Sequence, residues 1–219
     1  MALLKQQRED LVPLCNRVDP YGKFHAVSER GLFTGNRGII HDPDTRSLLK
    51  RRWTTKAWII CALDHPRGAK REPMGRNGRS GGTGWTELFF ADEVTALAAG
   101  HRPCFYCRRE AAKGYVSRAT GDSIATIGDV DASLHRQRLA SGGRPKEISA
   151  LEAANLPDGV LIAMDGRPFA VRGGNAMSWS FAGYGDPIQI RKPVQQITPE
   201  LTVAVLRSGY QPIWATPAP

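Results

Sequence analysis

The sequence predicts an α+β fold, in which a unit of strands and short helices precedes a small β-rich unit with a C-terminal helix. Three observations predict it. Runs rich in β-branched and aromatic residues, Trp53–Leu63 and Thr86–Phe90, are typical of strands. Helix-capping residues bracket the segment from Asp92 to Gly100. Asp165-Gly166 separates two apolar runs, as a two-residue hairpin turn does.

The 219 residues fit one large domain or two small ones. We expect a first unit over residues 1–119 and a second unit, a hairpin plus a helix, over residues 156–219. The polar segment 120–155 between them is interrupted by glycine and proline. It is predicted to be a boundary region with one helix near Asp131–Leu139.

The elements of the first unit follow from local signals. Residues 21–38 predict a hairpin that turns at Glu29-Arg30-Gly31. A glycine-rich loop over 75–84 separates the two strands named above. Asp92 is a good N-cap for a helix that ends at Gly100, and a second helix is predicted over Arg108–Ala119.

The second unit begins with a hairpin, Val160–Met164 and Pro168–Val171, around Asp165-Gly166. Its last predicted element is a helix over Leu201–Ser208, preceded by Thr198 as the N-cap and by a proline at the first helical position.

The longest apolar run, Ala57–Leu63, is far shorter than the ~20 residues that a membrane-spanning helix needs. The first ten residues carry no apolar stretch of signal-peptide length. We therefore expect a cytoplasmic protein that does not bind membranes.

Positive charge is concentrated in one part of the chain. The net charge is +9. The window Arg46–Ser80 holds ten basic residues against Asp64 and Glu72, and ten minus two leaves +8. Such clustering is typical of a protein that binds a polyanion, although a solvated basic face has the same composition. The candidate phosphate-binding residues are Arg51, Arg52, Lys70, Arg71, Arg76 and Arg79. Trp53, Trp58 and Trp85 lie within or beside this window and could stack on bases.

Cys104 and Cys107 form a CxxC motif, which in the absence of an export signal indicates metal or redox chemistry rather than a disulfide. A structural zinc site needs four sulfur or nitrogen ligands. Cys61 is the expected third ligand, and His65, four residues later, is the expected fourth. His41 competes with His65 for that place. The alternative is a pair of buried, reduced cysteines without a metal.

The segment Glu93–Cys107 resembles the second half of the zinc domain of the Ada adaptive-response DNA-repair proteins, in which a short helix leads through Ala-Ala-Gly and Arg-Pro into a zinc-binding CxxC. Trp58–Pro66 is similar to the first half, but His65 stands where that family has a cysteine. The resemblance covers about Trp53–Arg109. The whole chain also resembles uncharacterised bacterial proteins of similar size, through residues 35–38, His41-Asp42 and 58–61, and this strengthens His41 as a ligand candidate.

The Ada resemblance implies zinc, DNA binding and a methyl-accepting thiolate at Cys61. Replacing one thiolate by a neutral histidine makes the zinc site less negative and Cys61 less nucleophilic, so DNA binding carries over better than methyl transfer. A second catalytic candidate is an acid–base pair of Asp131 and His135, which are spaced i,i+4 on the predicted helix.

The sequence thus predicts a zinc-containing DNA-binding protein that acts in repair or processing of modified DNA. One alternative is a DNA-processing enzyme, a nuclease, glycosylase or alkyl-transfer protein, with its site between the two units. The other is a protein-interaction module.

Overall fold

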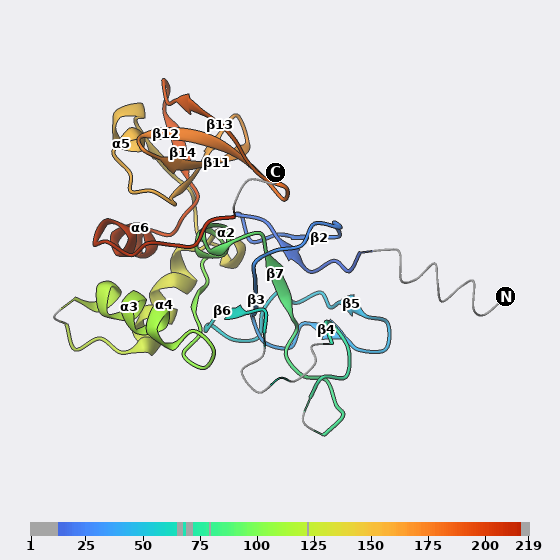
Figure 1. The fold of residues 1–219 in the computed structure, drawn as a ribbon. Coiled ribbons are helices and arrows are strands. Elements are labelled where there is room, and N and C mark those ends of the chain that lie inside the picture. The colour runs from blue at the N-terminus through green and yellow to red at the C-terminus, as the bar shows by residue number, and fades with distance from the viewer. Residues whose placement is uncertain (1–12, 65–67, 69–71, 79, 122, 216–219) are drawn as a thin grey trace.

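The computed structural model describes residues 13–64, 68, 72–78, 80–121 and 123–215. Over these residues the chain forms two six-stranded sheets, a two-stranded sheet and five α-helices, which confirms the α+β class (Figure 1). None of the helices in these ranges combines the length and the apolar character needed to cross a bilayer.

The first sheet has the strand order β2-β1-β7-β3-β6-β8. Its strands are β1 (Arg17–Val18), β2 (Phe24–His25), β3 (Phe33–Asn36), β6 (Ile59–Ala62), β7 (Leu88–Phe90) and β8 (Arg102–Pro103). β3 pairs antiparallel with both β6 and β7, and β8 pairs parallel with β6. The two-stranded sheet consists of β4 (His41–Asp42) and β5 (Ser47–Leu48).

The predicted hairpin over residues 21–38 is wrong. β2 pairs with β1, whereas β3 pairs with β6 and β7. Gly31 is a point of close backbone approach rather than part of a hairpin turn, because a Cβ there would lie 1.8 Å from the carbonyl oxygen of Phe90. The neighbouring Leu32 N–H donates to the carbonyl oxygen of Ala91 at 3.0 Å.

The helices of the first half are α2 (Glu93–Ala98), α3 (Arg109–Thr120) and α4 (Ile127–Gln137), followed by the 3₁₀ turn η1 (Leu139–Ser141). The prediction for α2 is confirmed: the Asp92 carboxylate accepts from the Thr95 N–H at 2.8 Å, and Gly100 has φ +80°. α4 begins earlier than predicted, because Thr126 and Asp129 form a capping box.

The second sheet is antiparallel, with the order β13-β12-β11-β10-β14-β9. Its strands are β9 (Lys146–Ile148), β10 (Leu161–Met164), β11 (Arg167–Arg172), β12 (Asn175–Ser180), β13 (Gly183–Gln189) and β14 (Val194–Gln196). The predicted turn is confirmed: Asp165 and Gly166 have φ +51° and +75° between β10 and β11. The remaining helices are α5 (Ala150–Ala154) and α6 (Glu200–Arg207). α6 lies at the predicted place, but Pro199 and not Thr198 is its N-cap, because the Thr198 hydroxyl accepts from the Leu161 N–H at 2.8 Å.

The two halves share one hydrophobic core, which includes Val18 and Leu88 from the first sheet and Ile162 and Val171 from the second. Figure 1 shows α2 near the centre of the molecule, and α3 and α4 on the same side as α6, with which both are in contact.

Buried acidic residues at the start of α2 add polar contacts across the junction. The Asp92 carboxylate accepts from the hydroxyl of Tyr184 at 2.8 Å, and that of Glu93 accepts from the hydroxyl of Tyr210 at 2.6 Å. The backbone N–H of Ile213 also donates to the Glu93 carboxylate at 3.1 Å, and that of Ala215 donates to the Asp92 carboxylate at 3.0 Å. The first turn of α2 thus holds the second sheet and the final described residues in place.

A buried cationic cluster surrounds Trp58, the residue before β6. The guanidinium carbons of Arg37 and Arg138 lie over the indole of Trp58, 3.8 Å and 4.1 Å from the ring centroid. The Nε of Arg37 donates to Nε2 of His101 at 3.2 Å. All four side chains are buried. Burial, together with the positive charges of Arg37 and Arg138, holds the pKa of His101 well below its usual value.

This environment predicts that acid destabilises the protein through His101. The neutral ring binds no proton in the folded state, whereas the unfolded ring binds one below pH ~6.5. The free energy of unfolding should therefore fall as the pH drops below that value, by up to about 1.4 kcal/mol per pH unit. Denaturant titrations at several pH values measure how the free energy of unfolding changes with pH. This dependence should be weaker for His101→Gln than for the unmodified protein, and an equal dependence would contradict the role of His101.

Candidate metal centre and basic surface

The three predicted cysteine ligands come together. Cys61 lies on β6, Cys104 follows β8, and Cys107 lies in the loop before α3, with their sulfur atoms all within 4.8 Å of one another. The parallel pairing of β6 with β8 produces this arrangement, since the Cys104 N–H donates to the carbonyl oxygen of Ile60 at 2.9 Å. Three thiol groups at this separation can bind one soft or borderline metal ion such as zinc.

Backbone N–H groups point at two of the sulfur atoms. The N–H of Tyr106 donates to the Cys104 sulfur and that of Ala62 to the Cys107 sulfur, each at 3.4 Å. The Arg108 N–H also donates to the carbonyl oxygen of Cys104 at 2.9 Å and closes the loop into the start of α3. Such contacts favour thiolates over thiols, as a metal site requires.

The protonation of the three sulfurs is coupled. Hydrogen bonds from Cys107 and Cys61 lower the pKa of Cys104 to about 2, and the contact with Cys104 raises the pKa of Cys61. Three thiolates this close repel one another, so full ionisation needs a neutralising cation. The donor set therefore fits a metal ion.

The fourth ligand is not His41. Its Nδ1 is bonded to the Thr86 hydroxyl at 2.6 Å and its Nε2 to the carbonyl oxygen of Gly75 at 3.1 Å, so both ring nitrogens are engaged away from the sulfurs. Within the part of the chain that the structure describes, no histidine or carboxylate joins the three cysteines. His65 lies outside the described residues.

Two arginines that hold the cysteine loop, Arg102 and Arg108, were not identified from the sequence as functional. The Arg102 guanidinium donates to both carboxylate oxygens of Asp131, at 2.7 Å and 2.8 Å, in a buried pair. Arg108 forms a second ion pair, 2.8 Å from the Glu93 carboxylate. The only sequence signal was that both arginines flank the CxxC motif.

This geometry overturns the proposed acid–base pair of Asp131 and His135. The Asp131 carboxylate is bound by Arg102, whereas the ring of His135 packs perpendicular to that of Trp53, with ring centroids 4.7 Å apart. Burial, followed by the charges of Arg138 and Lys56, lowers the pKa of His135. The i,i+4 spacing placed both residues on α4, but it did not determine their partners.

The predicted phosphate-binding residues have different surroundings. Arg51 and Arg52 are exposed before β6. Arg76 is exposed too, but it forms an ion pair with Asp44. Lys70, Arg71 and Arg79 lie outside the described residues.

The three tryptophans divide in a similar way. Trp58 is completely buried, whereas Trp53 is 38% exposed and Trp85 60% exposed. Four cations and one tryptophan in the segment before β6 are exposed, and we call them the basic surface: Lys50, Arg51, Arg52, Trp53 and Lys56.

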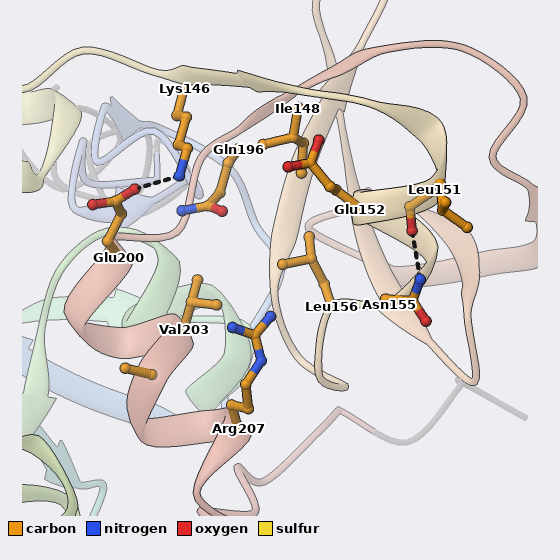
Figure 2. Close-up of a pocket in the computed structure, with 11 residues that line it drawn as sticks. Lys146, Ile148, Leu151, Glu152, Asn155, Leu156, Gln196, Glu200, Val203 and Arg207 are labelled. Carbon is orange, nitrogen blue, oxygen red and sulfur yellow. Dashed lines mark hydrogen bonds and ion pairs between the residues drawn. The ribbon is translucent and has the colours of Figure 1, made fainter.

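The second half of the chain contains a pocket of about 520 Å³ between β9, α5 and α6. Figure 2 shows the Lys146–Glu200 ion pair at its rim and the apolar side chains of Leu156 and Val203 within it. None of the residues predicted to be functional lines this pocket, so it is separate from the candidate site.

Comparison with family models, with curated proteins and with solved structures finds no match to this chain. The function is therefore inferred from the chemistry of the metal centre and of the basic surface.

Proposed function

We propose that this protein is a zinc-stabilised nucleic-acid-binding protein whose partner is DNA. The observation that carries the proposal is the basic surface, in which consecutive exposed cations, Lys50, Arg51 and Arg52, precede an exposed tryptophan. Arg51 makes no hydrogen bond or ion pair with another described residue, so its guanidinium is available to a phosphate.

The metal supports this surface rather than reacting with the nucleic acid. Zinc bound by Cys61, Cys104 and Cys107 would join β6 to the loop before α3, and His65 is the proposed fourth ligand. Four protein ligands make a closed site, which has a structural role. The surface leads directly into β6, so fixing Cys61 also fixes the strand that the basic segment enters.

Binding is favoured over catalysis because each catalytic candidate is engaged in another contact. Asp131 is occupied by Arg102, and His135 packs against Trp53. Cys61 faces the other two sulfur atoms and serves as a metal ligand in this proposal.

The proposal predicts that affinity for a DNA duplex falls steeply with salt, because each neutralised phosphate releases counterions. The double variant Lys50→Gln/Arg51→Gln should bind more weakly, and its log–log salt dependence should be flatter by about one to two units. Fluorescence anisotropy of a labelled duplex at several salt concentrations measures both quantities.

The matched control is Arg144→Gln/Arg207→Gln, which removes two exposed charges from the second half of the chain. It should leave the slope nearly unchanged. Absence of duplex binding at low salt would refute the assignment of this surface to double-stranded DNA, and an equal loss in both double variants would refute the assignment of binding to this surface.

A further inference from the structure

We infer that the preferred ligand of the basic surface is an unpaired nucleic-acid strand, whose bases stack on Trp53 and Trp85. This inference rests on the proposed function, because it specifies the kind of nucleic acid that the same surface accepts. The side chains of Trp53 and Trp85 are exposed to solvent, whereas the nearby Trp58 is buried in the core.

Both tryptophans are attached to the same turn. The N–H of Thr54 donates to the carbonyl oxygen of Arg37 at 2.8 Å, and that of Thr86 donates to the carbonyl oxygen of Gly38 at 3.1 Å. Each tryptophan immediately precedes one of these anchored threonines. The segments of Thr54 and Thr86 each lie one hydrogen-bonded spacing, about 4.8 Å, from the turn at Arg37 and Gly38. The backbones of the two tryptophans are therefore roughly 10 Å apart.

The turn holds its neighbours closely. Gly38 has φ +96°, and a Cβ there would lie 1.9 Å from the hydroxyl oxygen of Thr54. The hydroxyl groups of Thr54 and Thr86 accept from the next two N–H groups of the turn, at 3.1 Å and 2.8 Å. The backbones that carry the tryptophans are therefore fixed before any ligand binds, which lowers the entropic cost of binding.

The surroundings of the rings match the chemistry of a single strand. Ile39, in the same turn, is 37% exposed and extends the apolar area. The cations Arg51 and Arg52 directly precede Trp53 and can contact phosphates while the rings contact bases. In a duplex, base faces are covered by neighbouring base pairs, and only their edges are accessible in the grooves. Ring stacking therefore requires unpaired bases.

The test compares three ligands of about 16 nucleotides: oligothymidylate, oligouridylate and a DNA duplex. We expect tighter binding of the single strands than of the duplex, with quenching of tryptophan fluorescence. Trp85→Ala and Trp53→Ala should each weaken single-strand binding by about 5-fold to 150-fold. Trp85→Ala should leave duplex binding nearly unchanged, and Trp53→Ala should weaken duplex binding less than single-strand binding. The two single-stranded ligands show whether the surface prefers DNA or RNA.

Two controls separate stacking from folding. Trp53→Phe keeps an aromatic ring beside His135 and should retain most of the affinity that Trp53→Ala loses. Leu151→Ala removes an exposed apolar side chain from α5 and should change nothing.

Preference for the duplex, or unchanged single-strand affinity in both alanine variants, would overturn the inference and leave the proposed function intact. Failure of all three ligands to bind at low salt would overturn both.

Discussion

Replacing Cys104 by serine should release the metal ion and lower the melting temperature of the whole protein by on the order of 10 °C. A serine hydroxyl is a poor zinc ligand, and the remaining sulfurs of Cys61 and Cys107 cannot complete a closed site. Because the metal binds the folded chain and not the unfolded one, its binding energy contributes to folding. Elemental analysis of the purified protein and thermal unfolding measure the two effects.

Cys15→Ser is the matched control, since this cysteine is exposed and lies outside the cluster. It should leave metal content and melting unchanged. The same measurements distinguish the roles of His65 and His41. His65→Ala should weaken metal binding, whereas His41→Ala should destabilise the fold without metal loss, because His41 binds Thr86 and Gly75 instead. A metal-free protein that melts like its Cys104→Ser variant would contradict the metal assignment.

Removing the Asp131 carboxylate should cost about 3–5 kcal/mol of folding free energy, because Asp131→Ala leaves the buried guanidinium of Arg102 without its partner. Chemical denaturation of the metal-loaded protein measures this loss. The double variant Arg102→Met/Asp131→Leu should recover most of it, since an apolar pair of similar volume has no unpaired charge.

The exposed ion pair of Glu110 and Lys113 supplies the control. Glu110→Ala should change the stability by less than about 0.5 kcal/mol. Near-native stability of Asp131→Ala would show that the Arg102 pair is not a structural contact, and it would return Asp131 to the list of catalytic candidates.

Some elements could be predicted because their signals are local. The capping interaction of Asp92, the left-handed Gly100 and the Asp165-Gly166 turn each depend on residues only a few positions apart. The CxxC pair belongs to the same class, since a short loop alone keeps Cys104 close to Cys107.

Other features depend on contacts between distant segments. Gly31 looked like a turn residue, but its role is set by the carbonyl oxygen of Phe90. The ring of His41 is held by Thr86, 45 positions away, and the Asp131 carboxylate by Arg102, 29 positions away. No pattern near these residues specifies those partners, so the i,i+4 spacing led to the wrong acid–base pair, and the resemblance to other bacterial proteins favoured a histidine that lies outside the cysteine cluster.

The buried carboxylates at the start of α2 also have a consequence for synthesis on the ribosome. Asp92 and Glu93 emerge well before Tyr184, Tyr210 and Ala215, which satisfy them in the native state. Tyr184, the first of these partners to be made, lies 91 residues after Glu93, which corresponds to roughly 5–18 s of translation at typical rates. During that interval the carboxylates of Asp92 and Glu93 lack all three of these hydrogen-bond partners. The core around α2 therefore closes only late in translation, and the nascent first half depends on the second half to finish folding.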